Sequence, residues 1–477
     1  MADKPELTAP VNSDGTFKLI VPPGKYKLIF TSENYVDTTV DEIEVTAGGV
    51  TEASTVLPQK GAVQKVEVVE KVGAVAANAE AMLTERKLAA VVSDGLSAEE
   101  IRKTVASDAA GAVEKVTGVS IVDSGYVYVR GLGERYSSTM LNNAMIPTTE
   151  PEKRVVPLDL FPASLIDNIK VLKTYSPDLP GEFSGGVVQM RTVEFPTART
   201  LRFSMSYGIN SVTTGKRFGG YAGGARDFFG FEDGTRQLPG VVPTDRRVIA
   251  GAFNDQQTQE IGRSFANNWI LAPNESMRPS QSYSFSGGDS FWKGRIGIVG
   301  AITFTNQPQR TQEVQRYLRT GTGGRPFVFT DYDNFNVANE SARLGAVLNV
   351  SLRLNATNKI LFRNTVTRDT DKEGRQFTGL NGGIDSVIEA TRLRWVERGL
   401  VSTGVEGEHA IAKLKNSLLT WQFTYSTSAR REPDMRETIR GQEANGRFSF
   451  LPNPDSGTRL FTGLSDKIYE PLTEFST

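Results

Sequence analysis

From about residue 200 onward, apolar and polar residues alternate in runs of about ten. Clear runs cover residues 201–210, 295–305, 343–354 and 419–426. Side chains of a β-strand point alternately to its two faces, so each run predicts a strand with one apolar and one polar flank. Strands of soluble β-sandwiches are usually about five or six residues long, whereas a tilted strand needs about ten to cross a bilayer. The pattern favours a large antiparallel transmembrane β-barrel, with the arginines of the polar flank in a watery lumen.

Polar, glycine-rich segments separate many of these runs, for example residues 211–247 and 320–340. Long loops on one side and short turns on the other are typical of outer-membrane barrels. Aromatic residues of the first segment are candidates either for stacking on a sugar or chelate ring or for lying at a membrane interface. These residues are Tyr221, Phe228, Phe229 and Phe231.

Residues 81–196 have a different pattern, which predicts a compact α/β unit. Ser97 and Glu100 have the spacing of a capping box, and Ser107 or Asp108 is a candidate cap for a second helix. Gly118 stands where a helix C-cap glycine is expected. The strands expected here cover residues 119–122, 126–130, 168–173 and 186–192.

The N-terminal segment predicts a separate small β-unit. Short alternating runs at residues 17–21 and 25–30 flank a Pro22-Pro23-Gly24 turn, which is typical of a small β-sandwich over residues 1–59. Residues 60–80 form a linker. Its valine-rich stretch Val66-Glu67-Val68-Val69 is either an interdomain strand or a peptide that adds as a strand to a partner's sheet edge.

Composition excludes several classes of protein. The 477 residues carry 54 basic and 55 acidic side chains, so the chain lacks the basic excess of a nucleic-acid binder. The absence of cysteine excludes disulfides and thiolate metal sites. With a mean hydropathy of −0.30, the chain has no apolar run long enough for a spanning helix. The single histidine, His409, lacks the companions of a zinc protease or a serine triad, so no catalytic site is expected.

Several motifs, in order, resemble the TonB-dependent outer-membrane receptors. They lie at residues 94–100 (DGLSAEE), 129–136 (VRGLGERY), 158–162 (LDLFP), 171–178 (VLKTYSPD), 182–186 (EFSGG), 230–239 (GFEDGTRQLP) and 393–398 (LRWVER). One departure is Asn142-Asn143, where the family usually has Asn-Gly. Residues 11–57 resemble a carboxypeptidase-regulatory-like, Ig-like module.

The resemblance implies a plug domain at residues 81–196 and the first part of a barrel of about 22 strands at residues 197–477. We then expect an internal fragment that lacks the export signal and the second half of the barrel. It implies a transporter in the outer membrane of a Gram-negative bacterium, which takes up a scarce, bulky extracellular nutrient and is energised by TonB, ExbB and ExbD. Val66, Glu67, Val68 and Val69 would form the TonB box. No cofactor, metal or enzymatic activity is expected.

Six residues of the plug motifs are the candidate site: Arg130, Gly131, Gly133, Arg135, Gly185 and Gly186. Gly131-Leu-Gly133 lacks the third glycine and the strand–helix context of a dinucleotide fingerprint, so we expect a tight turn beside the barrel wall. Arg130 and Arg135 are candidates for ion pairs with inward barrel carboxylates; plain solvation is the alternative.

Three other hypotheses stay open at this point. A signalling receptor would use the N-terminal module to contact an anti-sigma partner, and a β-rich surface adhesin would use short strands with apolar inward faces. Asp331, Asp333 and Asn336 are closely spaced oxygen donors that could bind calcium or simply face solvent in an external loop.

Overall fold

The computed structural model divides into two compact units, Met1–Val72 and Gly73–Thr477, each described here by itself. The described residues are 8–12, 16–32, 35–45, 51, 55, 92–104, 106, 108–122, 126–133, 136–151, 156–161, 163, 166–175, 179, 185–194, 199–217, 220–249, 251–272, 276–411, 414, 417–452, 454 and 456–476. The candidate TonB box at residues 66–69 and the candidate Arg135 lie outside them.

The described part of the first unit is a β-hairpin. Strands β1 (Gly24–Ser32) and β2 (Tyr35–Val45) pair antiparallel, which confirms the strand expected at residues 25–30. Residues 17–21 lie outside both strands, contrary to expectation, and Phe17 packs edge-on against Phe30 with ring centroids 5.3 Å apart. The β-sandwich and the carboxypeptidase-regulatory-like module stay a prediction.

The second unit begins with an α/β unit (residues 92–194) that contains two small sheets. The first has the order β3 (Ser93–Ser97), β8 (Ile166–Leu172), β9 (Gly186–Thr192), β6 (Ser137–Leu141) and β7 (Ala144–Met145), with β6 and β9 parallel. The second pairs β4 (Val119–Val122) with β5 (Tyr126–Val129). The strands expected in this segment are thus present, each within a residue or two of its expected ends.

Short helices cover this sheet, and their caps follow from the sequence. Ser97 caps α3 (Ala98–Lys103) in a reciprocal capping box with Glu100, as predicted. Asp108 caps α4 (Ala109–Val113), while the 3₁₀ turn η2 (Leu158–Leu160) packs nearby. Gly118 has a φ of +71°, but it lies in the turn before β4, because α4 already ends at Val113 with Glu114 as its C-cap. A dry core forms between these elements and the sheet, including Val113, Leu158, Ile169, Val188 and Met190, all 0% exposed.

The two glycine motifs pack directly on each other. Gly131 turns the chain after β5 with a φ of +77°, which confirms the expected tight turn. A Cβ at Gly186 would lie 2.6 Å from Val129 Cγ2, and a Cβ at Gly185 would lie 2.9 Å from the Tyr136 carbonyl oxygen. Gly185 and Gly186 therefore permit β9 to lie against β5 and the turn that follows it.

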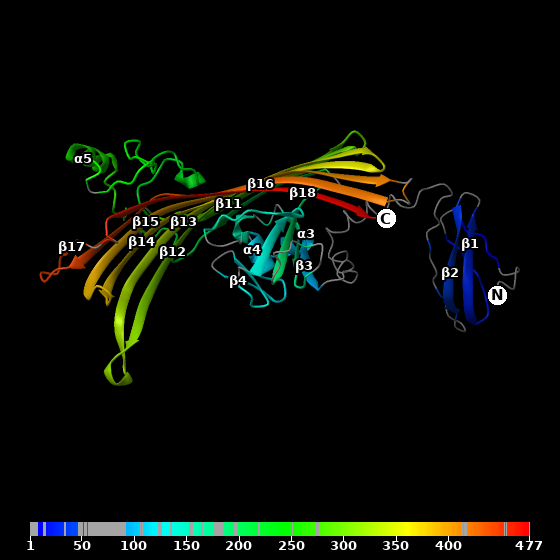
Figure 1. Ribbon diagram of the computed structural model, residues 1–477. Helices are drawn as coiled ribbons and strands as arrows, with labels where there is room; N and C mark the ends of the chain where they lie inside the picture. The colour runs from blue at the N-terminus through cyan, green and yellow to red at the C-terminus, as the bar shows by residue number, and fades with distance from the viewer. Residues whose placement is uncertain are drawn as a thin grey trace. The chain divides into compact units, whose positions relative to one another are not determined.

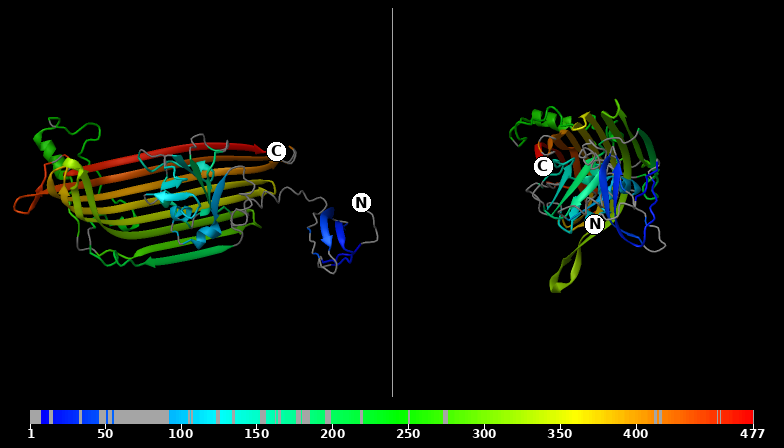
Figure 2. Two further views of the ribbon diagram at one scale, coloured as in Figure 1. Left: turned by 90° about the horizontal axis from the view of Figure 1, so that it is seen from below. Right: turned by 90° about the vertical axis from the view of Figure 1, so that its right-hand side faces the viewer.

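The described strands from residue 200 onward form one long antiparallel sheet. Its strands are β10 (Thr200–Gly208), β11 (Ser280–Phe291), β12 (Ile296–Thr320), β13 (Pro326–Asn355), β14 (Asn358–Asn381), β15 (Ser386–Ile411), β16 (Ser417–Gln442), β17 (Phe448–Phe450) and β18 (Thr458–Ser476). They pair in chain order, with both β17 and β18 beside β16. The sheet curves, and the α/β unit lies on its concave side (Figures 1 and 2). This part of the chain is a section of a barrel-like sheet, as the alternation predicts.

Two details of this sheet differ from expectation. Strands of about ten residues were expected, but β13 has 30 and β14 has 24. Residues 320–340 are not a long loop, because β12 and β13 continue to a tight connection around η5 (Thr322–Gly324). The alternating runs mark only the part of each strand where one flank is apolar, and the strands continue beyond it. At this end of the sheet, residues 209–279 form the longest connection, whereas residues 292–295 and 356–357 are short turns at the other end.

The packing of Gly186 predicts a specific cost for alanine. Val129 is β-branched and 0% exposed, so it has little freedom to move away, and we expect Gly186→Ala to destabilise the α/β unit by about 1–3 kcal/mol. Gly133→Ala is the matched control, because its Cβ would meet Tyr128 at 3.6 Å, an ordinary contact. Amide hydrogen exchange of β5 and β9 measures the effect; equal protection in both variants would contradict this packing account.

Candidate functional site

The α/β unit meets the long sheet through charged side chains, with Arg343 of β13 at the centre. Its guanidinium lies 2.9 Å from Asp108 Oδ2 and 3.4 Å from Asp159 Oδ2, both in the α/β unit, and 3.1 Å from Asp369 Oδ1 on β14. Asp108 is the cap of α4 and Asp159 lies in η2. One arginine of the sheet therefore bridges two elements of the unit that rests on it.

A second group of charges centres on Glu150. Arg430 of β16 lies 2.6 Å from Glu150 Oε2, and Arg398 of β15 lies 3.8 Å from Glu150 Oε1. Arg398 also pairs with Asp369, at 3.0 Å, and with Asp371. Arg398 thus links the Glu150 group to the Arg343 group through Asp369.

A third group holds the connection between the α/β unit and β10. Glu194 pairs with Arg363 of β14 and lies 3.7 Å from Lys359 Nζ, while Arg363 also reaches Glu406 of β15 at 3.3 Å. Burial opposes ionisation of Glu194, but the charges of Arg363 and Lys359 prevail and hold the pKa of this carboxyl at about 2. Glu194 therefore stays charged through the physiological range of pH.

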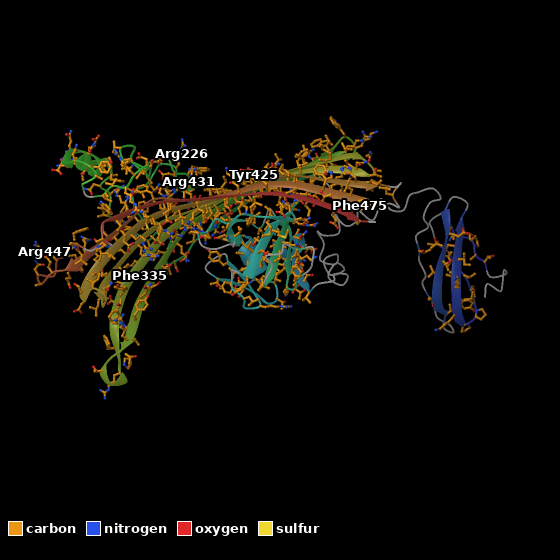
Figure 3. All side chains as sticks on the ribbon, viewed as in Figure 1. Arg226, Phe335, Tyr425, Arg431, Arg447 and Phe475 are labelled. Atoms are coloured by element: carbon orange, nitrogen blue, oxygen red, sulfur yellow. The ribbon has the colours of Figure 1, made fainter. Side chains whose placement is uncertain are left out.

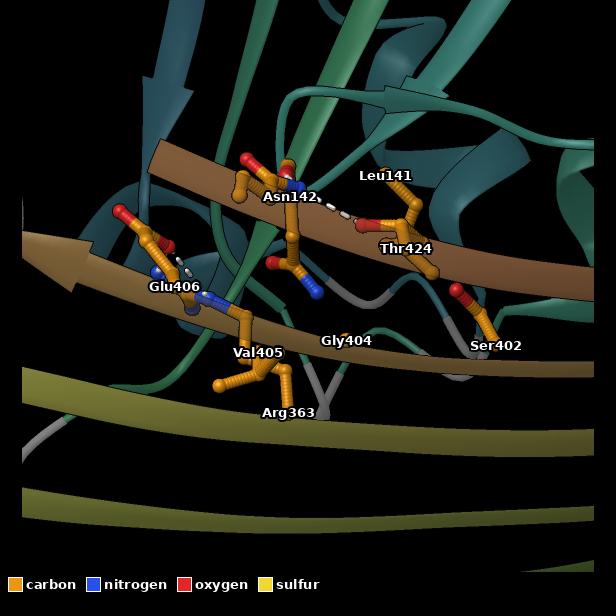
Figure 4. Close-up of a pocket in the computed structure, with 9 residues that line it drawn as sticks. Leu141, Asn142, Arg363, Ser402, Gly404, Val405, Glu406 and Thr424 are labelled. Carbon is orange, nitrogen blue, oxygen red and sulfur yellow. Dashed lines mark hydrogen bonds and ion pairs between the residues drawn. The ribbon is translucent and has the colours of Figure 1, made fainter. Parts of the chain in front are cut away.

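Neutral hydrogen bonds seal the space between these groups. Gln422 Nε2 donates to the Asn142 carbonyl oxygen at 2.8 Å, and Asn349 Nδ2 donates to Thr192 Oγ1 at 3.1 Å. Asn142 and Asn143 have φ of +52° and +66°, so this Asn-Asn pair forms a left-handed turn, which asparagine tolerates better than most residues. The cavity at this contact measures about 10 Å³, enough for one water molecule (Figure 4).

The opposite flank of the sheet is apolar and exposed. On β13, Asn349 is 0% exposed beneath the α/β unit, while its neighbour Leu348 is 51% exposed on the other flank. Exposed apolar side chains of this flank come from all eight long strands: Leu201, Phe203, Met205, Tyr207, Phe285, Ile298, Ile302, Leu348, Leu354, Phe362, Val366, Val401, Phe423, Tyr469 and Phe475. Figure 3 labels Tyr425 and Phe475 on this sheet. The predicted division into a polar and an apolar flank is confirmed.

Comparisons with known proteins bear on the α/β unit. The family model described as "TonB-dependent Receptor Plug Domain" matches residues 84–188. This segment, which overlaps the α/β unit, is similar to the plug domains of TonB-dependent receptors. The α/β unit (residues 92–194) is called the plug below, and the polar interface is its contact with the long sheet. No curated protein matches the chain.

Solved structures similar to the chain include a receptor, a transporter and an importer. A mutant of the ferric enterobactin receptor PfeA from Pseudomonas aeruginosa has 12% identity over 82% of this chain and 59% of that one, with a TM-score of 0.36. The unliganded ferric citrate transporter FecA has 11% identity over 83% and 55%, with a TM-score of 0.37. The RagAB peptide importer in its closed-closed state has 10% identity over 81% and 53%, with a TM-score of 0.38. The chain thus spans somewhat more than half the length of these structures.

None of the described candidate residues of the plug motifs forms one of these ion pairs, and Arg135 lies outside the described part. Arg130 Nη1 donates to the Lys173 carbonyl oxygen at 3.2 Å, so its hydrogen bond stays within the plug. Among the described residues, the ion pairs run the other way from the expectation, with carboxylates on the plug and arginines on the sheet. Arg130 itself has a φ of +53° in the turn after β5.

Sequence reasoning missed the four carboxylates that the plug contributes. They are Asp108, Glu150, Asp159 and Glu194. Asp108 was recognised as a helix cap, and Asp159 lies inside the LDLFP motif, but neither pattern names a partner more than 150 residues away. The available signal was the set of arginines on the polar flank, which require buried counter-charges once the flank is covered.

Two further sequence candidates have ordinary structural roles. His409 lies in β15, where Trp421 Nε1 donates to its Nε2 at 2.9 Å and its Nδ1 lies 2.7 Å from Asn358 Oδ1. Asp331, one of the possible calcium ligands, pairs with Arg316 at 2.9 Å. No group of acidic or histidine side chains with metal-binding geometry occurs in the described part of the chain. None of the described helices is long and apolar enough to span a membrane.

The charges around Arg343 do not balance. Arg343, Arg398 and Arg430 face five carboxylates, namely Asp108, Glu150, Asp159, Asp369 and Asp371. Burial, together with the nearby Asp369 carboxylate, raises the pKa of the Asp159 carboxyl to about 7. A proton on Asp159 relieves the excess negative charge at the plug contact.

This raised pKa gives the plug contact a predictable pH dependence. When the plug is in contact with the sheet, Asp159 holds a proton that a solvated Asp159 would release near its ordinary pKa of about 3.9. The stability that this proton gives the plug contact is therefore complete below that pH and is lost as pH rises through about 7. Between pH 5 and 7 we expect opening of the plug to increase by up to about tenfold per pH unit, the limit for one proton. The hydrogen-exchange protection factor of the η2 amides measures this opening. Asp159→Asn should flatten this slope, and an unchanged slope in that variant would assign it to another group.

Proposed function

We propose that the chain is part of a TonB-dependent transporter of the outer membrane of a Gram-negative bacterium. One observation carries the proposal: a plug domain rests on the polar flank of a long antiparallel sheet whose other flank is exposed and apolar. An apolar flank is stable against hydrocarbon, and a polar flank against a watery lumen. The sheet then forms part of the barrel wall, and the plug blocks the lumen.

The composition of the interface suits a plug that has to move. Among the described residues, Leu400 is the one residue of the sheet in the hydrophobic core cluster of the plug, while ion pairs and hydrogen bonds connect plug and sheet at several other places. Charged and amide groups regain hydrogen bonds to water when they separate, whereas apolar contacts lose their whole stabilisation. Plug and wall can therefore part without unfolding either one.

Energy for this movement would come from a periplasmic partner. We propose that Val66, Glu67, Val68 and Val69 pair as a strand with TonB, which the ExbB–ExbD motor pulls. Strand addition supplies affinity through backbone hydrogen bonds, and these can share a load along the strand direction. The cargo is proposed to be a scarce, bulky extracellular nutrient that enters from the side opposite TonB.

TonB-driven movement of the plug away from the sheet can be tested without knowledge of the cargo. The chain has no cysteine, so Asn349→Cys places one thiol beneath the plug, at a position that is 0% exposed. In cells whose growth depends on the full-length receptor, a membrane-impermeant maleimide should label this thiol only when TonB is present and the inner membrane is energised. Arg447→Cys, exposed on the β16–β17 connection, is the control that labels in all conditions. Equal labelling of Asn349→Cys with and without TonB would refute a TonB-driven gate.

The position of the TonB box is tested by proline. Val68→Pro removes one backbone donor from the proposed strand pairing, so TonB binding and uptake by the full-length receptor should be lost. Val75→Pro, seven residues further along the same linker, is the matched control and should leave both intact. If Val68→Pro binds TonB normally, the box lies elsewhere.

A further inference from the structure

The long connection between β10 and β11, residues 209–279, lies on the apolar side of the sheet. It is called the strap here. Ala338 and Ala342 of β13 are each 3% exposed although they share a flank with the exposed Leu348, with no register shift between residues 338 and 348. Gly230 of the strap covers this flank, since its Cβ would lie 3.2 Å from Ala342 Cβ. The strap, which carries α5 (Asp255–Ser264), therefore packs on the face opposite the plug (Figure 1).

The strap is anchored by a buried charge cluster. Arg236 is 1% exposed, pairs with Asp227 and Glu232 at 2.6 Å each, and lies over the Trp395 ring at 4.2 Å. Lys372 of β14 adds a second cation at 3.0 Å from Asp227. Such a cluster of buried ion pairs fixes the orientation of the strap, because removing any one partner would leave a buried charge. These contacts hold the strap in a defined position on the long sheet.

Further contacts spread the strap across the sheet. Asn306 Nδ2 of β12 donates to the Phe228 carbonyl oxygen at 3.0 Å, and Arg368 Nε of β14 donates to the Gly230 carbonyl oxygen at 2.7 Å. On the far side, Phe265 packs against Phe461 of β18 with ring centroids 6.2 Å apart. The strap therefore crosses the outer flank from β12 to β18.

The strap begins where the exposed apolar belt ends. On β13 the apolar positions run from residue 344 to residue 354, about 33 Å along a strand at about 3.3 Å per residue. A tilt of about 40° reduces this to roughly 25 Å, the height of the apolar band of an outer-membrane barrel. Ala342, the next position on this flank, is already covered by the strap. The edge of the strap thus coincides with the expected surface of the membrane.

Aromatic rings line this edge. Phe228 and Phe229 pack on Phe304 of β12, at 5.6 and 5.7 Å between centroids, and Phe229 remains 55% exposed. Phe231 lies beneath Arg368 at 4.6 Å. Aromatic side chains that are partly apolar and partly exposed favour the membrane–water interface. For Phe228, Phe229 and Phe231, this position fits the membrane interface better than stacking on a sugar or chelate ring. Tyr221 is instead buried, at 2% exposed, and its hydroxyl donates to the Arg394 carbonyl oxygen.

Cations gather at the same edge of the strap. Residues 216–217 run beside residues 276–277, through the hydrogen bond from Met277 N to the Lys216 carbonyl oxygen and the Arg217–Ser276 bridge. This pairing brings the exposed Lys216 and Arg217 close to Arg278, which lies 5.2 Å from the centre of the Phe228 ring. Arg226, also exposed, stands on the strap (Figure 3). Between this edge and β12–β14 lies a cleft of about 250 Å³, lined by Phe228, Arg278, Glu340 and Lys372.

We propose that the strap binds the phosphate-bearing headgroups of lipids in the outer leaflet. Arg226 and Arg278 would hold the phosphate through charge-assisted hydrogen bonds, while Phe228 and Phe229 contact the adjoining acyl region. The two acidic groups at the cleft are already engaged, Glu340 by Asn306 at 3.0 Å and Asp227 by Arg236 and Lys372. The proposal rests on the proposed membrane location of the sheet.

The test compares two lipids that differ only in phosphate. The full-length receptor is placed in phosphatidylcholine nanodiscs that contain either diphosphoryl lipid A or the same lipid with its phosphates removed. Hydrogen exchange of residues 211–231 should be about tenfold slower with the phosphorylated lipid, the effect expected of one or two charge-assisted hydrogen bonds. Arg226→Ser/Arg278→Ser should abolish this difference, and Arg447→Ser, at the exposed β16–β17 connection, should retain it.

The other outcomes are equally distinct. If the double variant keeps the full difference, or if inorganic phosphate alone slows exchange in the phosphate-free discs, the assignment to lipid headgroups is overturned while the membrane location stands. If the receptor fails to insert into either disc, the proposed function and this inference fall together. Both substituted arginines are exposed, so insertion of the double variant itself serves as the check that it is folded.

Discussion

The whole second unit depends on one constraint, the two-residue period of its long strands. In β13 this period sends Arg343, Val347, Asn349 and Ser351 to the plug and Leu344, Leu348, Val350 and Leu352 to the opposite side. A shift of one residue would place charges on the apolar side and leucines against the plug carboxylates, so the register is strongly specified. Because the same register is carried through seven neighbouring strands, the two environments extend across the entire sheet.

Ion pairs, more than apolar contacts, hold the plug on the long sheet. Arg343 connects α4, η2 and β14 in one cluster, and Arg398 joins that cluster to Glu150. Buried ion pairs contribute little net stability but impose a heavy penalty on any arrangement that leaves one partner alone. They define where the plug sits while leaving it separable, which is the combination that a gate requires. The surplus of carboxylates, relieved by a proton on Asp159, makes this contact responsive to pH.

Sequence reasoning succeeded where the signal is local. Ser97 and Glu100 predicted the start of a helix, and Gly131 predicted a tight turn. The alternation at residues 343–354 predicted a strand with one polar and one apolar flank. It failed where a role depends on a contact between residues that are remote in sequence. Arg130 was chosen because it lies in a recognisable motif, whereas the arginines that hold the plug lie in strands whose partners are remote in sequence. The position of the strap could not be predicted for the same reason, since the sequence of residues 209–279 does not indicate which flank of the sheet they cover.

The central claim is that hydrocarbon and plug occupy opposite flanks of each strand. In a chain without cysteine, single nitroxide labels at successive positions 344–354 of β13 measure this directly, through their accessibility to oxygen, which concentrates in lipid, and to a water-soluble nickel chelate. The account predicts that even-numbered positions respond to oxygen alone and that odd-numbered positions are shielded from both. Equal access of the nickel chelate to both sets of positions would contradict it.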